Sequence, residues 1–64
     1  MTNPADQIKA IRQQTGLSQA RFADLYGLPK RTLENWESGQ RIPPPYVLAL
    51  LERAVKEDFP ATSA

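Results

Sequence analysis

The feature that most constrains this chain is a pair of short helical patterns joined by a tight turn at Gly27, within the stretch QARFADLYGLPKRTLENWES of residues 19–38. The first helix should begin after Ser18, a favourable N-cap residue. Gly27 should end it, because glycine adopts the left-handed conformation at a helix end without steric cost. The connection is too short for the two helices to lie side by side, so we expect them to cross at a steep angle. The apolar residues of the first helix recur at helical spacing and should form one apolar face, namely Phe22, Ala23, Leu25 and Tyr26.

The second helix of this stretch is expected over residues 29–37. Pro29 suits its first turn, where the missing N–H of proline is not needed. Leu33 and Trp36 are three residues apart and should both face inward, so we interpret Trp36 as a core residue rather than a platform for stacking bases. The opposite side of this helix carries polar residues that face water or a partner, namely Lys30, Arg31, Glu34 and Asn35.

This stretch resembles the helix-turn-helix of the lambda-repressor/Cro-type (XRE) family of DNA-binding proteins. The residues that match the family's spacing are Gln19, Ala23, Gly27, Leu33, Trp36 and Glu37, with the flanking segments GLSQ at 16–19 and WESG at 36–39. The resemblance covers residues 8–55. It implies an all-α fold, a compact lambda-repressor-like bundle of four, at most five, short helices, and a small bacterial regulator or antitoxin-like member of the family.

Two further helices should flank the motif. Asn3 and Pro4 are typical of a helix start, and a first helix is expected over residues 4–14 with Ile8 and Ile11 facing inward. A fourth helix is expected over residues 45–58, and Ile42 should anchor the preceding loop in the core. We therefore expect one DNA-binding domain over residues 1–58 and a frayed tail over 59–64, in which Phe59 is the candidate for docking.

Composition argues against several classes of function. The chain has 64 residues with no cysteine and no histidine, which removes disulfides, thiolate metal sites and the commonest general base. A catalytic site would depend on scattered carboxylates, so we expect neither an enzyme nor a metal or cofactor site. No signal-peptide core and no apolar run of about 20 residues is present. The expectation is therefore a cytoplasmic protein without a membrane partner.

The distribution of charge points to a polyanion at the helix-turn-helix. The net charge of the chain is only +1, but residues 9–41 contain six basic and three acidic side chains, and the remainder of the chain is net negative. A positive region that coincides with the motif suits contact with double-stranded DNA. The alternative interpretation is a solvated surface without a partner.

Residues near the start of the second motif helix should reach base edges in the major groove. Arg31 is the first candidate for a base contact, because arginine suits guanine; Asn35 suits adenine, and Lys30 could contact a base or a phosphate. Pro29 offers only an apolar touch on a thymine methyl group, and Arg21 should point outward as a solvated charge. The candidates for DNA phosphate contacts are Gln19, Thr32, Ser38 and Arg41. The family resemblance implies that Gln19 can also brace the second motif helix.

The resemblance also implies an ion pair between Arg12 and Glu37. In that interpretation Arg12 ties the first helix to the third and fixes their geometry. The alternative places Arg12 on a DNA phosphate.

The fourth helix has two apolar stripes. Leu48, Leu51 and Val55 form the stripe that matches the core positions of the family. The second stripe is turned by roughly 100° and serves either as a wide core face or as an interface with a partner. Its members are Tyr46, Val47, Leu50 and Ala54.

The leading hypothesis for function is a sequence-specific DNA-binding protein that represses transcription. One copy would make a small interface, so specificity should come from two copies, as a homodimer, on a palindromic operator. The alternative hypothesis is an antitoxin or adaptor whose main partner is another protein, such as a toxin, bound through the fourth helix. A third hypothesis, a scaffold that has lost DNA binding, does not explain Lys30, Arg31 and Arg41.

Overall fold

The computed structural model describes residues 3–60. This part of the chain contains four α-helices, which confirms the expected all-α helix-turn-helix bundle. In chain order they are α1 (Pro4–Thr15), α2 (Gln19–Leu25), α3 (Lys30–Ser38) and α4 (Pro45–Asp58). The predicted bounds of α4 are confirmed, whereas α1 and α3 each end one residue later than predicted. Pro29 is the N-cap of α3 and has an extended ψ of 135°, so it precedes the helix instead of occupying its first turn.

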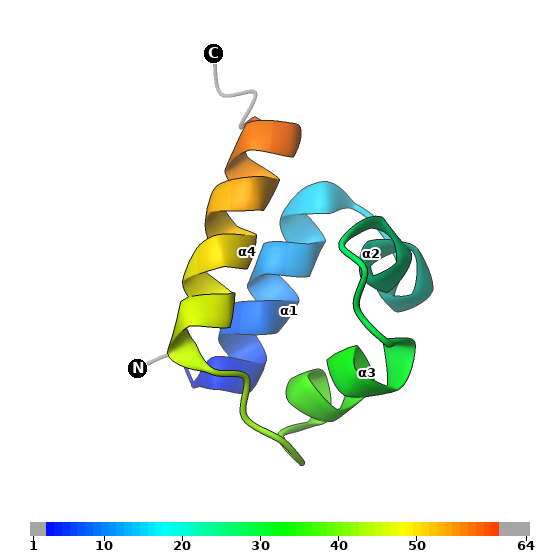
Figure 1. The fold of residues 1–64 in the computed structure, drawn as a ribbon, viewed down its shortest axis with the longest axis vertical. Helices are drawn as coiled ribbons and strands as arrows, with labels where there is room; N and C mark the ends of the chain where they lie inside the picture. Colours follow the sequence, from blue (N-terminus) through cyan, green and yellow to red (C-terminus); the bar gives the residue numbers. More distant parts are fainter. Residues whose placement is uncertain (1–2, 61–64) are drawn as a thin grey trace.

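Helix α1 is the element on which the other three pack (Figure 1). It lies beside α4 on one side and contacts α2 and α3 on the other. Eight buried side chains from all four helices form one core, namely Ile8, Ile11, Phe22, Ala23, Leu33, Trp36, Leu51 and Val55. Both predicted inward residues of α3 and both of α1 are therefore in the core.

The residues predicted to cap or end the helices do so in the structure. The side chain of Asn3 accepts a hydrogen bond of 2.8 Å from the backbone N–H of Asp6 at the start of α1, and that of Ser18 accepts one of 3.2 Å from Arg21 at the start of α2. In the turn between α2 and α3, Gly27 has a φ of +69°. This left-handed conformation lets the chain reverse within a few residues and places α3 across α2.

Two apolar residues lie elsewhere than the sequence predicts. Ile42 was expected to anchor its loop in the core, yet it is 74% exposed, and the adjacent Pro43 is fully buried. Neighbouring residues of an extended segment point in opposite directions, so only one of the two can face the core. Leu25 is 52% exposed. It lies on the flank of α2, because the inward side of that short helix is filled by Phe22, Ala23 and Tyr26.

The end of α4 is tied to the rest of the bundle. Phe59, where the predicted tail begins, is half-buried against the core, and its backbone N–H donates to the carbonyl of Val55 at 2.7 Å. The Tyr26 hydroxyl donates a hydrogen bond of 2.9 Å to Asp58. These contacts join the C-terminal ends of α2 and α4. The last four residues of the predicted tail, 61–64, lie outside the described residues.

We expect the Tyr26 contact to make stability fall at high pH. Burial, aided by the hydrogen bond to Asp58, raises the pKa of Tyr26 from its ordinary value of 10.0 to about 12. Because the fold favours the neutral phenol, this contribution is complete below pH 10 and is lost as the pH rises through the folded value. In a Tyr46→Phe background, ultraviolet titration should show Tyr26 ionising near that raised value. Ionisation at the ordinary value of a free tyrosine would contradict the proposed stabilisation.

Candidate nucleic-acid interface

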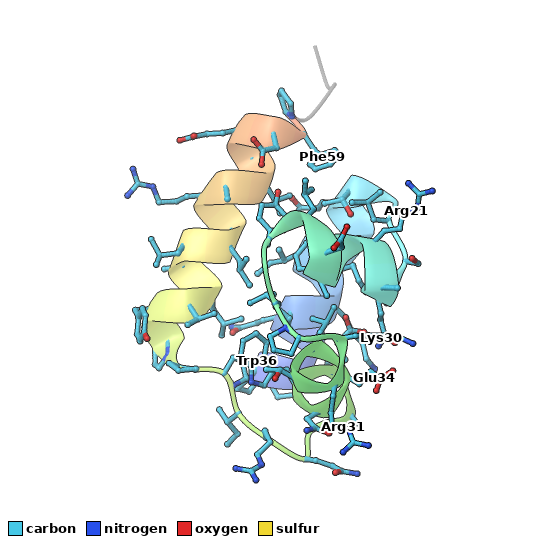
Figure 2. The ribbon with its side chains drawn as sticks, turned by 45° about the vertical axis from the view of Figure 1, so that its right-hand side comes forward. Arg21, Lys30, Arg31, Glu34, Trp36 and Phe59 are labelled. Atoms are coloured by element: carbon cyan, nitrogen blue, oxygen red, sulfur yellow. The ribbon has the colours of Figure 1, made fainter. Side chains whose placement is uncertain are left out.

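The exposed side of α3 carries two rows of side chains. Lys30 and Glu34, four residues apart, form the first row. Arg31 and Asn35 form the second row, and each directly follows a residue of the first row in the sequence. Figure 2 shows Arg31 at the lower end of the molecule, whereas Lys30 and Glu34 project to one side. The charges of the two rows differ, because only the first row contains an acid.

The first row is internally compensated. Lys30 Nζ lies 3.4 Å from Glu34 Oε2, with both side chains about half exposed. An exposed ion pair of this kind contributes little to stability. It nevertheless places a carboxylate beside the ammonium group of Lys30. Lys30 is therefore a weaker source of positive potential than its residue type suggests.

The second row lines a depression between α3 and the loop that leads to α4. This open depression has a volume of about 500 Å³ and is lined by Pro29, Arg31, Thr32, Asn35, Trp36, Arg41 and Ile42. The backbone N–H of Arg41 donates to the carbonyl of Asn35 at 3.2 Å, which holds the loop against α3. Two guanidinium-bearing residues and an amide thus converge from both sides of one depression.

The predicted phosphate contacts occupy different surroundings. Arg41 is exposed and Thr32 is half-buried, and both line the depression. The Ser38 hydroxyl donates to the carbonyl of Asn35 at 3.2 Å, so its hydrogen is engaged within α3. The side-chain nitrogen of Gln19 donates to Glu37 at 3.1 Å, and the backbone N–H of Gln19 lies in the first turn of α2.

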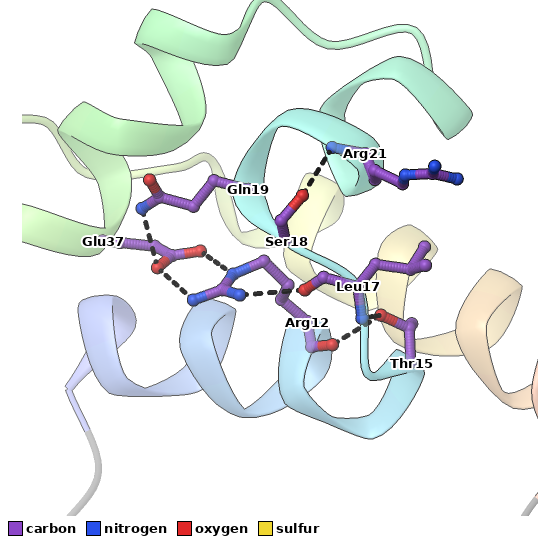
Figure 3. A network of polar contacts seen from close by, with 7 residues as sticks. All are labelled: Arg12, Thr15, Leu17, Ser18, Gln19, Arg21 and Glu37. Atoms are coloured by element: carbon purple, nitrogen blue, oxygen red, sulfur yellow. Dashed lines mark hydrogen bonds and ion pairs between the residues drawn. The ribbon is translucent and has the colours of Figure 1, made fainter.

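A polar network behind α3 holds the helix in place (Figure 3). The buried carboxylate of Glu37 accepts hydrogen bonds from Arg12 Nε at 2.7 Å, from Arg12 Nη2 at 3.1 Å and from Gln19 Nε2 at 3.1 Å. One side chain of α3 is therefore bonded to both α1 and α2. The ion pair implied by the family resemblance is present, and Arg12 faces the protein interior rather than a solvent-exposed groove.

The same network extends to the loop between α1 and α2. Arg12 Nη1 donates to the carbonyl of Leu17 at 3.0 Å, and the Thr15 hydroxyl accepts from the N–H of Leu17 at 3.0 Å. Hydrogen bonding to the Glu37 carboxylate raises the pKa of Arg12, so this guanidinium stays charged at any ordinary pH. The fixed charge and the planar pair of bonds give α3 one orientation relative to α1.

The second stripe of α4 divides in the structure. Tyr46 and Leu50 are 68% and 58% exposed. Val47 packs against the core, and Ala54 is half-buried. The exposed part of the stripe is therefore narrower than the sequence predicts, because the turn of α4 that carries Val47 leans on the bundle.

Two residues near the depression were not singled out as functional from sequence. The sequence predicts Ile42 in the core and Glu34 only as a residue that faces water or a partner. The four-residue spacing of Lys30 and Glu34 on one helix was the available signal for the pair. The exposure of Ile42 had no comparable signal, because it depends on the path of the chain after α3.

Among residues 3–60, no helix is long and apolar enough to cross a membrane. The same part of the chain contains no group of three or more acidic side chains placed to hold a metal ion.

Comparison with known proteins agrees with this geometry. A family model described as "Helix-turn-helix" matches residues 8–60, most of the chain. The chain is also similar to the antitoxin HigA-2 of Vibrio cholerae, with 43% identity over 47 residues, which is 73% of this chain and 45% of that protein. The chain thus matches a little under half the length of this curated relative. No solved structure gives a significant match.

Proposed function

The chain belongs to the lambda-repressor/Cro-type (XRE) helix-turn-helix family, and on this premise we propose that it binds a specific DNA sequence through α3 and represses transcription there. Helix α3 enters the major groove with its N-terminal end toward the base pairs, as helix-turn-helix proteins do. The observation that supports this proposal is the convergence of Arg31, Asn35 and Arg41 on one depression beside α3.

The chemistry of these side chains suits DNA. Arg31 donates to guanine O6 and N7, and Asn35 exchanges hydrogen bonds with adenine N6 and N7. Lys30 contacts a base or a phosphate once it separates from Glu34, and the weakness of that exposed pair makes the separation inexpensive.

The phosphate contacts position α3 and carry no sequence information. Arg41 supplies the exposed charge on the far side of the depression, and the backbone N–H of Gln19 meets a phosphate at the start of α2. Thr32 and Ser38 complete the set, with Ser38 giving up its internal bond to Asn35 when it donates to DNA.

Two copies of the chain occupy the operator in this proposal. A single domain of this size makes an interface of roughly 600–1,000 Å², which is small for a specific complex. A homodimer on a palindromic site doubles the contacts, with half-sites about one helical turn apart.

We expect tight, salt-sensitive binding to the region upstream of the chain's own gene. The affinity of a short duplex from that region should fall steeply as salt is raised, because bound cations are released from the phosphates. Quantitative footprinting should show two protected half-sites related by a two-fold axis. A single unpaired half-site at saturation would contradict the palindromic operator, and equal affinity for random duplexes would contradict specific recognition.

An alternative function is that of an antitoxin, whose main partner is another protein. The similarity to a protein named an antitoxin favours it, and so does the exposed pair Tyr46 and Leu50 on α4. Val47 and Ala54 would then support the interface from behind. The discriminating measurement is direct titration with the purified product of the adjacent gene. Failure of that protein to bind, while DNA binds specifically, would leave the repressor as the sole function.

A further inference from the structure

We propose that Ile42, in the loop after α3, packs against hydrocarbon of the duplex. The hydrocarbon is either a thymine methyl group in the major groove or the carbon face of a deoxyribose. This inference rests on the proposed DNA-binding function and adds an apolar contact to the polar ones described above.

The first observation is that Ile42 is exposed, whereas the residues before and after it are fixed by a hydrogen bond and by burial. Ile42 is 74% exposed, the largest exposed fraction among the large hydrophobic residues exposed within 3–60. The backbone of Arg41 is bonded to Asn35, and the ring of Pro43 is fully buried. The loop therefore presents the isoleucine from a fixed backbone, which lowers the entropy lost on binding.

The second observation concerns the residues that surround Ile42. It lines the same depression as Arg31, Asn35 and Arg41, the residues whose chemistry suits bases and phosphates. The apolar contribution to this depression also includes Pro29 and Trp36. A surface that combines two guanidinium groups, an amide and exposed aliphatic carbon matches the edge of the DNA major groove, where thymine alone presents a methyl group.

The other exposed apolar side chains lie in different surroundings. Leu25 lines a separate depression with Arg21 and Phe59, at the opposite end of the molecule from Arg31 (Figure 2). Tyr46 and Leu50 lie on α4 and do not line the depression beside α3. Among these four exposed residues, only Ile42 shares the proposed DNA-binding depression.

The test uses the full chain and a duplex that the wild-type protein enriches from a random-sequence pool. We expect Ile42→Ala to bind this duplex about fourfold more weakly, or worse, because at least one buried methyl group is lost. Its melting temperature should stay unchanged, since the side chain is exposed. Leu25→Ala is the matched control, an exposed aliphatic residue truncated away from the depression, and should bind as the wild type does.

Single thymine-to-uracil replacements in the duplex then distinguish the two sources of hydrocarbon. If Ile42 meets a thymine methyl, one replacement weakens wild-type binding by about fourfold and leaves Ile42→Ala unaffected. If Ile42→Ala weakens binding, but each uracil replacement changes the affinity of the wild type and of Ile42→Ala equally, the contact is with a deoxyribose.

Two outcomes overturn the inference. In the first, Ile42→Ala binds the duplex as tightly as the wild type does. In the second, Ile42→Ala differs from the wild type only in self-association, measured by analytical ultracentrifugation. The proposed function itself fails in a distinguishable way, because the wild-type protein would then enrich no sequence from the pool.

Discussion

Replacing Arg31 with alanine is expected to lower the preference of the protein for its operator over random DNA by about 5- to 150-fold. A bidentate arginine–guanine contact is worth about 1–3 kcal/mol of discrimination against the wrong base. Arg31 is exposed at the start of α3, on the side of the helix that lines the depression, so its guanidinium can reach the groove without rearrangement of the core. Binding to operator and random duplexes, measured in parallel at several salt concentrations, gives the ratio directly.

Two matched variants separate base recognition from general electrostatics. Arg53→Ala removes the same charge from an exposed residue of α4, outside the helix-turn-helix, and should change neither affinity nor preference. Lys30→Ala should weaken operator and random binding more evenly, because its charge is compensated by Glu34 and the lysine carries less directional information. If Arg31→Ala instead lowers both affinities equally, Arg31 is a phosphate contact and another residue recognises the base.

Replacing Glu37 with alanine is expected to destabilise the fold by about 3 kcal/mol, a large part of what a domain of this size can have. The loss is large because the carboxylate is 4% exposed and accepts three hydrogen bonds. Its removal leaves the Arg12 guanidinium charged and partly buried without its partner. Urea unfolding followed by the fluorescence of Trp36, the single tryptophan of the chain, measures the change.

Three variants test whether the network, and not the loss of volume, causes this effect. Gln19→Ala removes only one of the three donors and should cost about 1 kcal/mol. The double variant Arg12→Met with Glu37→Leu should be more stable than Glu37→Ala, because neither charge is then left alone. Glu37→Gln keeps the shape of the side chain but loses the charge and should lie between the wild type and Glu37→Ala. Wild-type stability of Glu37→Ala would contradict the role assigned to the pair.

The helices could be predicted from sequence because the signals that define them are local. Asn3 and Ser18 cap α1 and α2 with their own side chains, and the inward positions of Leu33 and Trp36 follow from a spacing of three on one helix. Errors of one residue occurred at the ends of α1 and α3, where the sequence offers several acceptable stopping points. Pro29 satisfies the rules for either the first helical residue or the residue before it.

The candidate site could be predicted only in part. The choice of Lys30, Arg31 and Asn35 follows from the polar side of α3. The four-residue spacing of Lys30 and Glu34 indicates their pairing, but the sequence does not show that the row of Arg31 and Asn35 faces the loop after α3. The division of the α4 stripe, with Val47 inward and Leu50 outward, likewise depends on how α4 leans against α1.

The residues alone were sufficient to predict the type and approximate extent of the four helices, the tight turn at Gly27 and the polar character of the exposed side of α3. Two features could be seen only in the folded chain: Pro43 is buried while Ile42 is exposed, and Arg41 comes to the same depression as Arg31. The physical reason is the range of the interactions. Caps and periodicity act within four residues, whereas Arg12 and Glu37 are separated by 25 residues and meet only when α1 and α3 pack together.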